Sequence, residues 1–325
     1  MADTLARVTL LEGLGDTALA DLRRIATPFA VAAGEVLFRQ GDPPSGLFVL
    51  DRGLLEIATR MPGDEEARVS RIGPGEVLGE FALLDPAPRS ARVVAVEASE
   101  GLFLSARSFL AMLEEGREGA VAAIDRLRTL VARRTRATLE RLGAANVTGP
   151  EELRHVPTGR PGEPLTLDFE TVRAIDRFAA FDAAQAAEML AAGEGLALER
   201  GALLMTAGAE ASSLALVLRG AIRAAFARAG GLEQVTIHGP GEWAGLVAAI
   251  DGGAQPLALY AAEDSLLFRV PLERFSQWRS QPGPVGQAIL NGVDRQLVRD
   301  QRRANRHLGR AIALERFNAA GREAA

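Results

Sequence analysis

Apolar and polar positions alternate in short runs over the first hundred residues of the chain. One alternating run passes through Leu55 and Ile57 after a glycine-containing turn, and an apolar run follows from Val93 to Val96. Runs of this length, bounded by glycine and proline, predict β-strands. From residue 108 to 142 the apolar positions instead recur every three to four residues, with arginines between them. This spacing predicts a long amphipathic helix after the strands.

The same pattern occurs twice. Residues 201–271 restate residues 34–105, and a second helical run follows at about 284–317. The turn glycines of the two copies coincide: Gly34, Gly41 and Gly53 fall opposite Gly201, Gly208 and Gly220. A period of about 166 residues is too long for a solenoid and indicates two copies of one domain. We therefore expect a first domain over 1–142, a linker rich in loop-forming residues over 143–175, and a second domain over 176–325.

Composition narrows the classes of chemistry open to the chain. Its 325 residues are 48% hydrophobic and 24% charged, which is typical of globular domains. There is no cysteine and no lysine, so all 37 basic residues are arginine. Thiol nucleophiles, disulfides, cysteine-based metal sites, Walker-type phosphate loops and Schiff-base chemistry are thereby excluded.

The remaining sequence-wide features point away from a membrane, a metal or an enzyme. No apolar run reaches the ~18 residues of a membrane span, and no signal-peptide pattern opens the chain, so we expect a cytoplasmic protein. The three histidines show no ligand spacing, and no nucleophile–base constellation is visible. The net charge of −5 makes nucleic acid an unexpected partner. The bias toward Arg, Ala and Gly favours a bacterial source.

Residues 79–91 carry the most specific chemical pattern. A carboxylate, Glu80, and a guanidinium, Arg89, stand at either end of a short apolar segment among small residues. An arginine offers a bidentate fork to a phosphate, and backbone N–H groups in a tight turn add to an anion site. The pattern suits a ligand with one phosphate and a free hydroxyl. Read alone, the same residues also fit a surface turn between two strands.

The segment resembles the phosphate-binding cassette of the cyclic nucleotide-binding domain family, found in bacterial transcription activators and kinase regulatory subunits. The preceding runs 33–42, 46–57 and 72–76 match the order and spacing of that family's β-roll, and the resemblance covers roughly 5–142. It implies a mixed β and α fold. The expected architecture is two jelly-roll-like antiparallel β-rolls, each with N-terminal helices and a long C-terminal helix.

The resemblance also implies a set of ligand contacts for cAMP or cGMP in the first domain. Arg89 is expected on the phosphate and Glu80 on the ribose 2′-hydroxyl, and cAMP is favoured over cGMP. The further expected contacts are backbone groups of Gly79, Phe81, Ala82, Ser90 and Ala91, a base pocket at Val69, Ser70 and Leu78, and helix residues Arg134 and Thr138. For Thr138 an ordinary position on the helix surface is an equal alternative.

The second copy lacks the charged pair. Leu246 stands opposite Glu80, Gln255 opposite Arg89, and Pro256 opposite Ser90. A buried phosphate would have no cationic partner there, so we expect no cyclic nucleotide bound in the family's way. A structural or partner-binding copy, or a pocket for a less charged ligand, remain open.

The leading hypothesis is a non-catalytic regulator without a cofactor. A cyclic nucleotide in the first domain would re-dock the helix at 119–142 and change its contacts with the second domain or with an unidentified protein partner. Both a homodimer and an internal pseudo-dimer through the two long helices are open. The alternative is a scaffold that binds no nucleotide. A transcription regulator is disfavoured because no helix-turn-helix pattern follows the first domain.

Overall fold

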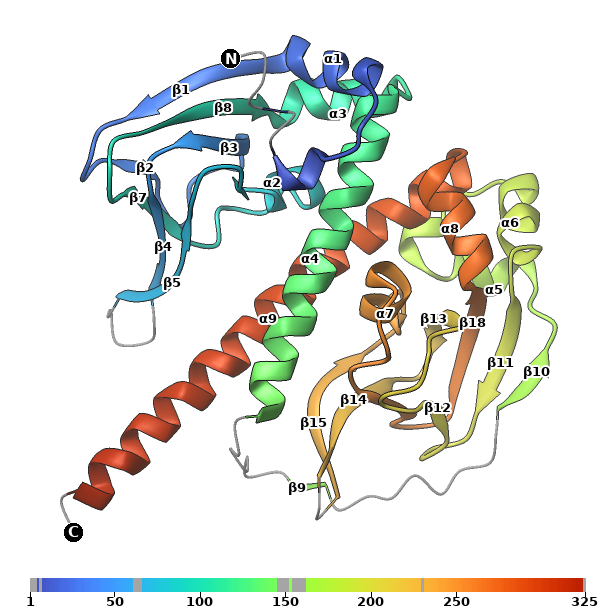
Figure 1. Ribbon diagram of the computed structural model, residues 1–325. Helices are drawn as coiled ribbons and strands as arrows, with labels where there is room; N and C mark the ends of the chain where they lie inside the picture. The colour runs from blue at the N-terminus through green and yellow to red at the C-terminus, as the bar shows by residue number, and fades with distance from the viewer. Residues whose placement is uncertain are drawn as a thin grey trace. The chain divides into compact units, whose positions relative to one another are not determined.

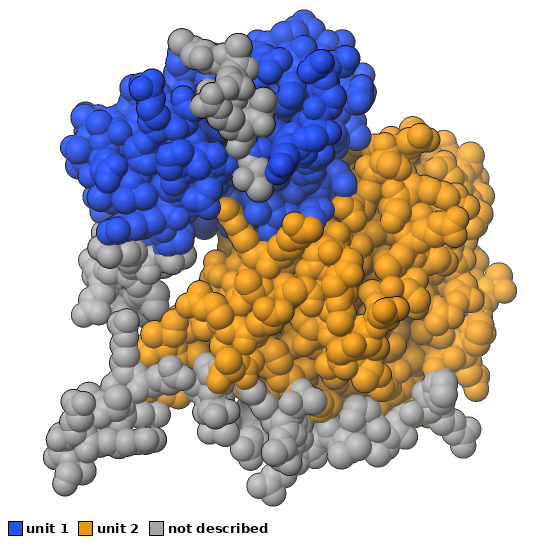
Figure 2. Space-filling model, viewed as in Figure 1, with its two compact units in different colours: residues 1–130 blue, residues 131–325 orange. Residues whose placement is uncertain are grey.

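The computed structural model describes residues 5, 8–60, 66–144, 152–153, 162–228 and 231–323. The chain divides into two compact units, residues 1–130 and 131–325 (Figure 2).

The first unit is a roll of two four-stranded antiparallel sheets (Figure 1). Their strand orders are β1-β8-β3-β6 and β2-β7-β4-β5. The strands are β1 (Ala26–Val31), β2 (Val36–Phe38), β3 (Gly46–Arg52), β4 (Leu55–Arg60), β5 (Glu66–Ile72), β6 (Val77–Leu78), β7 (Arg92–Ala95) and β8 (Ser99–Ser105). The helical segments are η2 (Thr9–Leu11), α1 (Asp16–Ile25), α2 (Phe81–Leu84), α3 (Ala106–Glu114) and the start of α4 (Glu118–Ala144).

The core of this roll draws on both sheets. Residues 46–50 of β3 are all buried, because β3 lies in the interior of its sheet between β8 and β6. Phe48 and Leu50 pack with Leu55 of β4, Ile72 of β5 and Leu78 of β6 in one apolar cluster. Leu78, the last residue of β6, belongs to this core, so the cassette begins directly at its edge.

The second unit repeats the first almost element for element. Its sheets have the orders β10-β11-β18-β13-β16 and β12-β17-β14-β15-β9. The strands are β9 (Glu152–Leu153), β10 (Glu163–Leu165), β11 (Glu194–Leu198), β12 (Leu203–Met205), β13 (Ser213–Arg219), β14 (Ile222–Arg228), β15 (Gly231–His238), β16 (Trp243–Ala244), β17 (Ala258–Ala261) and β18 (Ser265–Pro271). The helical segments are α5 (Phe169–Arg173), η3 (Asp176–Phe178), α6 (Ala183–Leu190), α7 (Leu246–Asp251), α8 (Leu272–Ser280) and α9 (Pro284–Glu323).

The repetition extends to local irregularities. The pairing of β3 with β8 shifts register between Leu50 and Arg52, and that of β13 with β18 shifts between Val217 and Arg219. Gly53 and Gly220, which follow these strands, have φ of 97° and 83°. A side chain at either would need a backbone conformation that only glycine adopts at low cost. The predicted fold, two β-rolls with helices, is confirmed.

The expected first helix is two helices. α3 ends at Glu114, Gly116 adopts φ 68°, and α4 begins at Glu118 and runs to Ala144. The boundary between the compact units falls inside α4, at 130/131, whereas the sequence pattern places the domain end at 142. The second long helix, expected at 284–317, continues to Glu323.

The expected linker at 143–175 is partly structured. β9 pairs with β15 and β10 with β11, so both extend the sheets of the second unit, and α5 follows. A strand of two or three residues is too short for an alternation of apolar and polar residues to be recognised. The sequence of this linker therefore shows only loop-forming residues. Residues 145–151 and 154–161 of this linker lie outside the described residues.

Candidate ligand-binding site

The cassette begins where β6 leaves the sheet. Leu78 pairs with Phe48 of β3 and is buried in the core, and Gly79 then turns the chain with φ 81°. A Cβ added at Gly79 would lie 2.5 Å from Nη1 of Arg89 and 2.9 Å from the carbonyl oxygen of Gly46. Position 79 therefore needs glycine both for its backbone angle and for the approach of Arg89.

Glu80 starts the short helix α2 and is only 7% exposed. Ala82, the second residue of α2, is buried and its N–H donates to the carbonyl of Gly79 at 3.0 Å. Phe81 is half-buried. Glu80 and its neighbours are thus held in one tight turn beside the core.

Arg89 is buried, at 7% exposure, and its guanidinium is held by uncharged groups. Nη2 donates to the carbonyl of Gly46 at 2.8 Å and to Oγ of Ser45 at 3.0 Å, and Nη1 donates to the carbonyl of Gly79 at 3.2 Å. Its Cζ lies 4.3 Å from the ring centroid of Phe38, within cation–π range.

Burial sets the electrostatic state of Arg89 more strongly than the nearby carboxylates do. Burial lowers its pKa from the usual arginine value, and the carboxylates of Glu80 and Asp42 oppose that shift. Its Nε is buried and has no hydrogen-bond partner among the described residues. A buried polar group in this state is costly unless a partner is supplied, and an anion at Arg89 would supply one.

The other predicted contacts of the first domain differ in exposure and in the elements that carry them. Ser90 is exposed and Ala91 half-buried, just before β7. Ser70 lies in β5 with its side chain exposed, and Val69 precedes it, its side chain outside the described residues. The pattern missed Phe38, Ser45 and Gly46, which hold Arg89. The only local signal among them was a glycine at position 46, where φ is 156°.

The two predicted helix contacts belong to the second unit. Thr138 is buried there, and its hydroxyl accepts a hydrogen bond from Nε2 of Gln301 in α9 at 3.2 Å. Thr135, one turn earlier, donates to Oε1 of the same glutamine at 2.7 Å. Arg134 is half-buried on the same stretch of α4. Within this unit, then, the last turns of α4 are bound to α9.

Arg136 fastens the same turns of α4 to the degenerate cassette. Its Nε and Nη2 donate to the two carboxylate oxygens of Asp251 at 2.5 and 2.7 Å, and Nη1 donates to the carbonyl of Ala254 at 2.6 Å. The Asp251 side chain is 3% exposed and that of Arg136 is 19% exposed. A bidentate, buried pair of this geometry is a strong contact.

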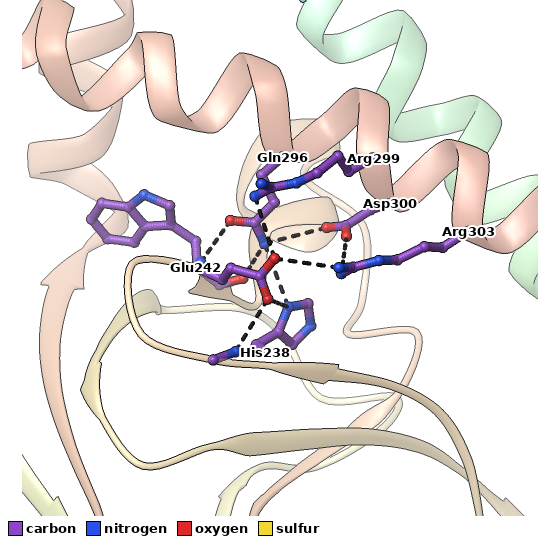
Figure 3. A network of polar contacts seen from close by, with 8 residues as sticks. His238, Glu242, Gln296, Arg299, Asp300 and Arg303 are labelled. Carbon is purple, nitrogen blue, oxygen red and sulfur yellow. Dashed lines mark hydrogen bonds and ion pairs between the residues drawn. The ribbon is translucent and has the colours of Figure 1, made fainter. Parts of the chain in front are cut away.

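A polar network joins α9 to the end of β15, to β16 and to the turn between these strands, just before the second cassette (Figure 3). Gln296 accepts a hydrogen bond from the N–H of Trp243 and donates to its carbonyl, both at 2.7 Å. Glu242 lies among basic groups: Arg299 and Arg303 of α9 approach its Oε1 at 3.3 and 3.5 Å. His238 completes the network, with Nδ1 4.0 Å from Oε2 of Glu242.

Two negative findings concern the described residues alone. In that part of the chain no helix is long and apolar enough to cross a membrane. Within the same ranges, no group of three or more His, Asp or Glu side chains could hold a metal ion.

Comparison with known proteins supports the assignment of both units. The family model of the cyclic nucleotide-binding domain matches residues 28–115 and 196–281, together more than half of the chain. A CRP-like cAMP-activated global transcriptional regulator of Mycobacterium tuberculosis is 28% identical over 96 residues, 30% of this chain and 43% of the regulator. The cyclic AMP receptor protein of Thermus thermophilus is 38% identical over 80 residues, 25% of this chain and 37% of the receptor.

Each match to these regulators therefore spans less than half of the relative. Among solved structures, the regulatory domain of Toxoplasma gondii PKA with cAMP aligns over 88% of this chain and 92% of that one, at 19% identity and a TM-score of 0.33. The family match at two regions agrees with the internal repeat and with the paired β-rolls. The chain belongs to the cyclic nucleotide-binding domain family, and it carries two copies of that domain.

Proposed function

We propose that this chain is a non-catalytic regulator that binds one cyclic nucleotide, in its first domain. The observation that carries the proposal is Arg89, a buried guanidinium held by uncharged acceptors and left with an unpartnered Nε. A ligand phosphate would neutralise this charge and accept from the guanidinium, an interaction worth roughly 1.5–3 kcal/mol. The second copy has Gln255 in the same place and offers no such gain.

Within this proposal the cassette residues have separate tasks. Arg89 binds the cyclic phosphate and Glu80 accepts a hydrogen bond from the ribose 2′-hydroxyl. Backbone groups around Gly79, Ser90 and Ala91 complete the site. The ligand is cAMP rather than cGMP, which agrees with the names of the Mycobacterium tuberculosis and Thermus thermophilus relatives.

The regulatory output is a change in α4. This helix is continuous from Glu118 to Ala144, yet its residues up to 130 belong to one compact unit and those from 131 to the other. The second half of α4 is attached to the second unit through its own residues Thr135, Arg136 and Thr138. A nucleotide that favours one position of the first half therefore acts on a helix that is already held at its other end. The coupling can be no larger than the difference in nucleotide affinity between the two helix positions.

Thermal unfolding with and without nucleotide tests the proposal. At about 100 times its dissociation constant a ligand stabilises its domain by roughly 2.7 kcal/mol, a shift of a few degrees. We expect this shift with cAMP, a smaller one with cGMP, and none in Arg89→Gln. Glu80→Gln is the second variant, and Gln255→Ala at the matching position of the second domain is the control that keeps the full shift.

An absent shift with both nucleotides at millimolar concentration contradicts the proposal. It would favour a scaffold that uses both β-rolls for protein contacts alone. An equal shift in wild type and Arg89→Gln would place the ligand elsewhere.

A further inference from the structure

Four arginines of the second unit meet at one side of α9. Arg295, Arg299 and Arg303 follow each other at every fourth position of this helix, which places them along one face. Figure 3 shows Arg299 and Arg303 beside Glu242, in the turn between β15 and β16. The fourth residue, Arg177 of η3, packs against the same helix. These four residues are called the arginine cluster below.

The contact between Arg177 and α9 depends on a glycine inside the helix. A Cβ at Gly292 would overlap Nη1 of Arg177. A Cβ at Gly241, the residue before Glu242, would lie 3.7 Å from Nη2 of the same guanidinium. Gly292 lies one turn before Arg295, within a helix, where glycine is less favourable than alanine. The chain therefore admits Arg177 to a place beside arginines of the same charge.

The carboxylate nearest to this place is shared between several cations. Burial lowers the pKa of Arg177, and the charges of Arg299 and Arg295 lower it further. Glu242 opposes this shift. However, its Oε1 also lies 3.3 Å from Nη2 of Arg299 and 3.5 Å from Nη2 of Arg303. One carboxylate thus serves most of the cluster.

The cluster as a whole carries excess positive charge. Arg303 has a second carboxylate near it, because its Nη1 lies 3.5 Å from Oδ1 of Asp300. Among the described residues, Glu242 and Asp300 are the carboxylates that form ion pairs with the cluster. Four guanidinium groups against two carboxylates leave an excess of two charges. His238, 4.0 Å from Glu242, adds to this excess whenever it is protonated.

An anion can reach the cluster from solvent. The side chains of Arg299 and Arg303 are 43% and 32% exposed, and Arg295 is exposed. Arg177 is half-buried, and its Nη1 is buried without a hydrogen-bond partner among the described residues. Partly buried charges are screened less by salt than charges on an open surface. The repulsion within the cluster is therefore relieved best by a bound counter-ion.

We propose that the arginine cluster binds a phosphate group with two negative charges, either free phosphate or the terminal phosphate of a small metabolite. Guanidinium groups bind phosphate oxygens through paired, charge-assisted hydrogen bonds. A phosphate monoester carries about −1.5 to −2 charges at pH 7, which matches the excess on the cluster. The cyclic diester of cAMP carries a single charge and matches it less well. This inference does not depend on nucleotide binding by the first domain.

Urea unfolding followed by tryptophan fluorescence tests it in the full chain. Both tryptophans are buried in the second unit, so the signal reports the unit that carries the cluster. The probe is sodium phosphate at about 50 mM, compared with sodium chloride at the same ionic strength. For a dissociation constant near 1 mM, we expect the urea midpoint of the wild type to rise by roughly 1 M.

Two variants separate binding from the general stabilisation that phosphate gives to proteins. Arg295→Gln changes an exposed residue and removes one like charge. In chloride we expect it to unfold at the same urea concentration as the wild type or at a higher one, and in phosphate at a lower one. Arg274→Gln is the control, because Arg274 is exposed on α8 and donates to Gln277, and it should keep the full effect of phosphate.

A comparison of two nucleotides in the Arg89→Gln background identifies the source of the phosphate. Adenosine 5′-monophosphate has a terminal phosphate, and we expect cAMP to bind about fivefold more weakly, the effect of one partly exposed charge contact. Tighter binding of the monophosphate than of inorganic phosphate indicates a metabolite. Equal binding of the two indicates that phosphate alone is recognised.

Three outcomes overturn the inference. The first is an equal effect of phosphate on the wild type, Arg295→Gln and Arg274→Gln, which is the general salt effect alone. The second is cAMP binding as tight as that of the monophosphate. The third is displacement of phosphate by polyglutamate at a lower concentration than by the monophosphate, which would make the cluster a contact surface for an acidic protein.

Discussion

Replacing Arg136 with methionine tests how firmly α4 is attached to the second domain. The change removes the guanidinium that bridges Asp251 and Ala254 and leaves a carboxylate whose side chain is 3% exposed. Removing one partner of a buried ion pair costs about 3–5 kcal/mol, because the other charge stays buried without compensation. The N–H of Gly253 still donates to Asp251 at 3.0 Å, so we expect the lower end of that range, about 3 kcal/mol.

Urea unfolding followed by tryptophan fluorescence measures this loss in the right place. Both tryptophans, Trp243 and Trp278, are buried in the second unit, so the signal reports its unfolding. A loss of about 3 kcal/mol corresponds to a fall of roughly 6–12 °C in Tm for a unit of this size. In Arg136→Met/Asp251→Asn the two losses should not add, with a coupling of about 2 kcal/mol.

A matched surface pair provides the control. Arg269 bonds Glu194, and their side chains are 40% and 48% exposed. Exposed pairs contribute only about 0–1 kcal/mol. If Arg136→Met costs no more than Arg269→Met, the contact of Arg136 with the degenerate cassette is a surface contact and our account of the α4 attachment is refuted.

Two other substitutions follow from the geometry. Gly79→Ala should abolish nucleotide binding, measured by calorimetry, because its Cβ would lie 2.5 Å from Nη1 of Arg89 and 2.9 Å from the backbone oxygen of Gly46. The matching change Gly245→Ala has its closest contacts, at 2.8 and 3.0 Å, with the flexible Met205 side chain of the second unit, and it should leave nucleotide binding unchanged. Binding by both variants would contradict the role of Gly79. Burial raises the pKa of Asp300 above its usual 3.8, opposed by His238, Gln296 and Arg303. The folded state therefore holds this proton at a pH where the unfolded state releases it, so the contribution of Asp300 to stability falls as pH rises through that window. We expect Asp300→Asn to be more stable than wild type at pH 7, with the difference shrinking toward pH 4 in urea unfolding, and a constant difference would contradict the shift.

Local rules predicted most of the fold. The alternation of apolar residues and the turn glycines predicted the strands. The matching positions of Gly53 and Gly220 revealed the second copy, because a positive φ at the end of a strand favours glycine at that position whatever its tertiary contacts. The edge strands β9 and β10 were missed because two or three residues carry no period.

The candidate site was predictable in its charges and not in its surroundings. Arg89 and Glu80 stand out in the sequence, whereas Phe38 and Ser45 reach Arg89 through the closure of the roll, across about 44 to 51 residues. Likewise, the periodicity of α4 predicts which of its residues form the apolar face, but it does not predict which domain that face packs against. The bond from Arg136 to Asp251 spans 115 residues and has no local signature.

The number of cAMP molecules bound by each chain tests the central claim most directly. Isothermal titration of the full chain should give one site, lost in Arg89→Gln and kept in Gln255→Ala, with the fold of each variant checked by its unfolding transition. Two sites per chain, or one site that survives Arg89→Gln and is lost in Gln255→Ala, would contradict the assignment of the nucleotide to the first domain.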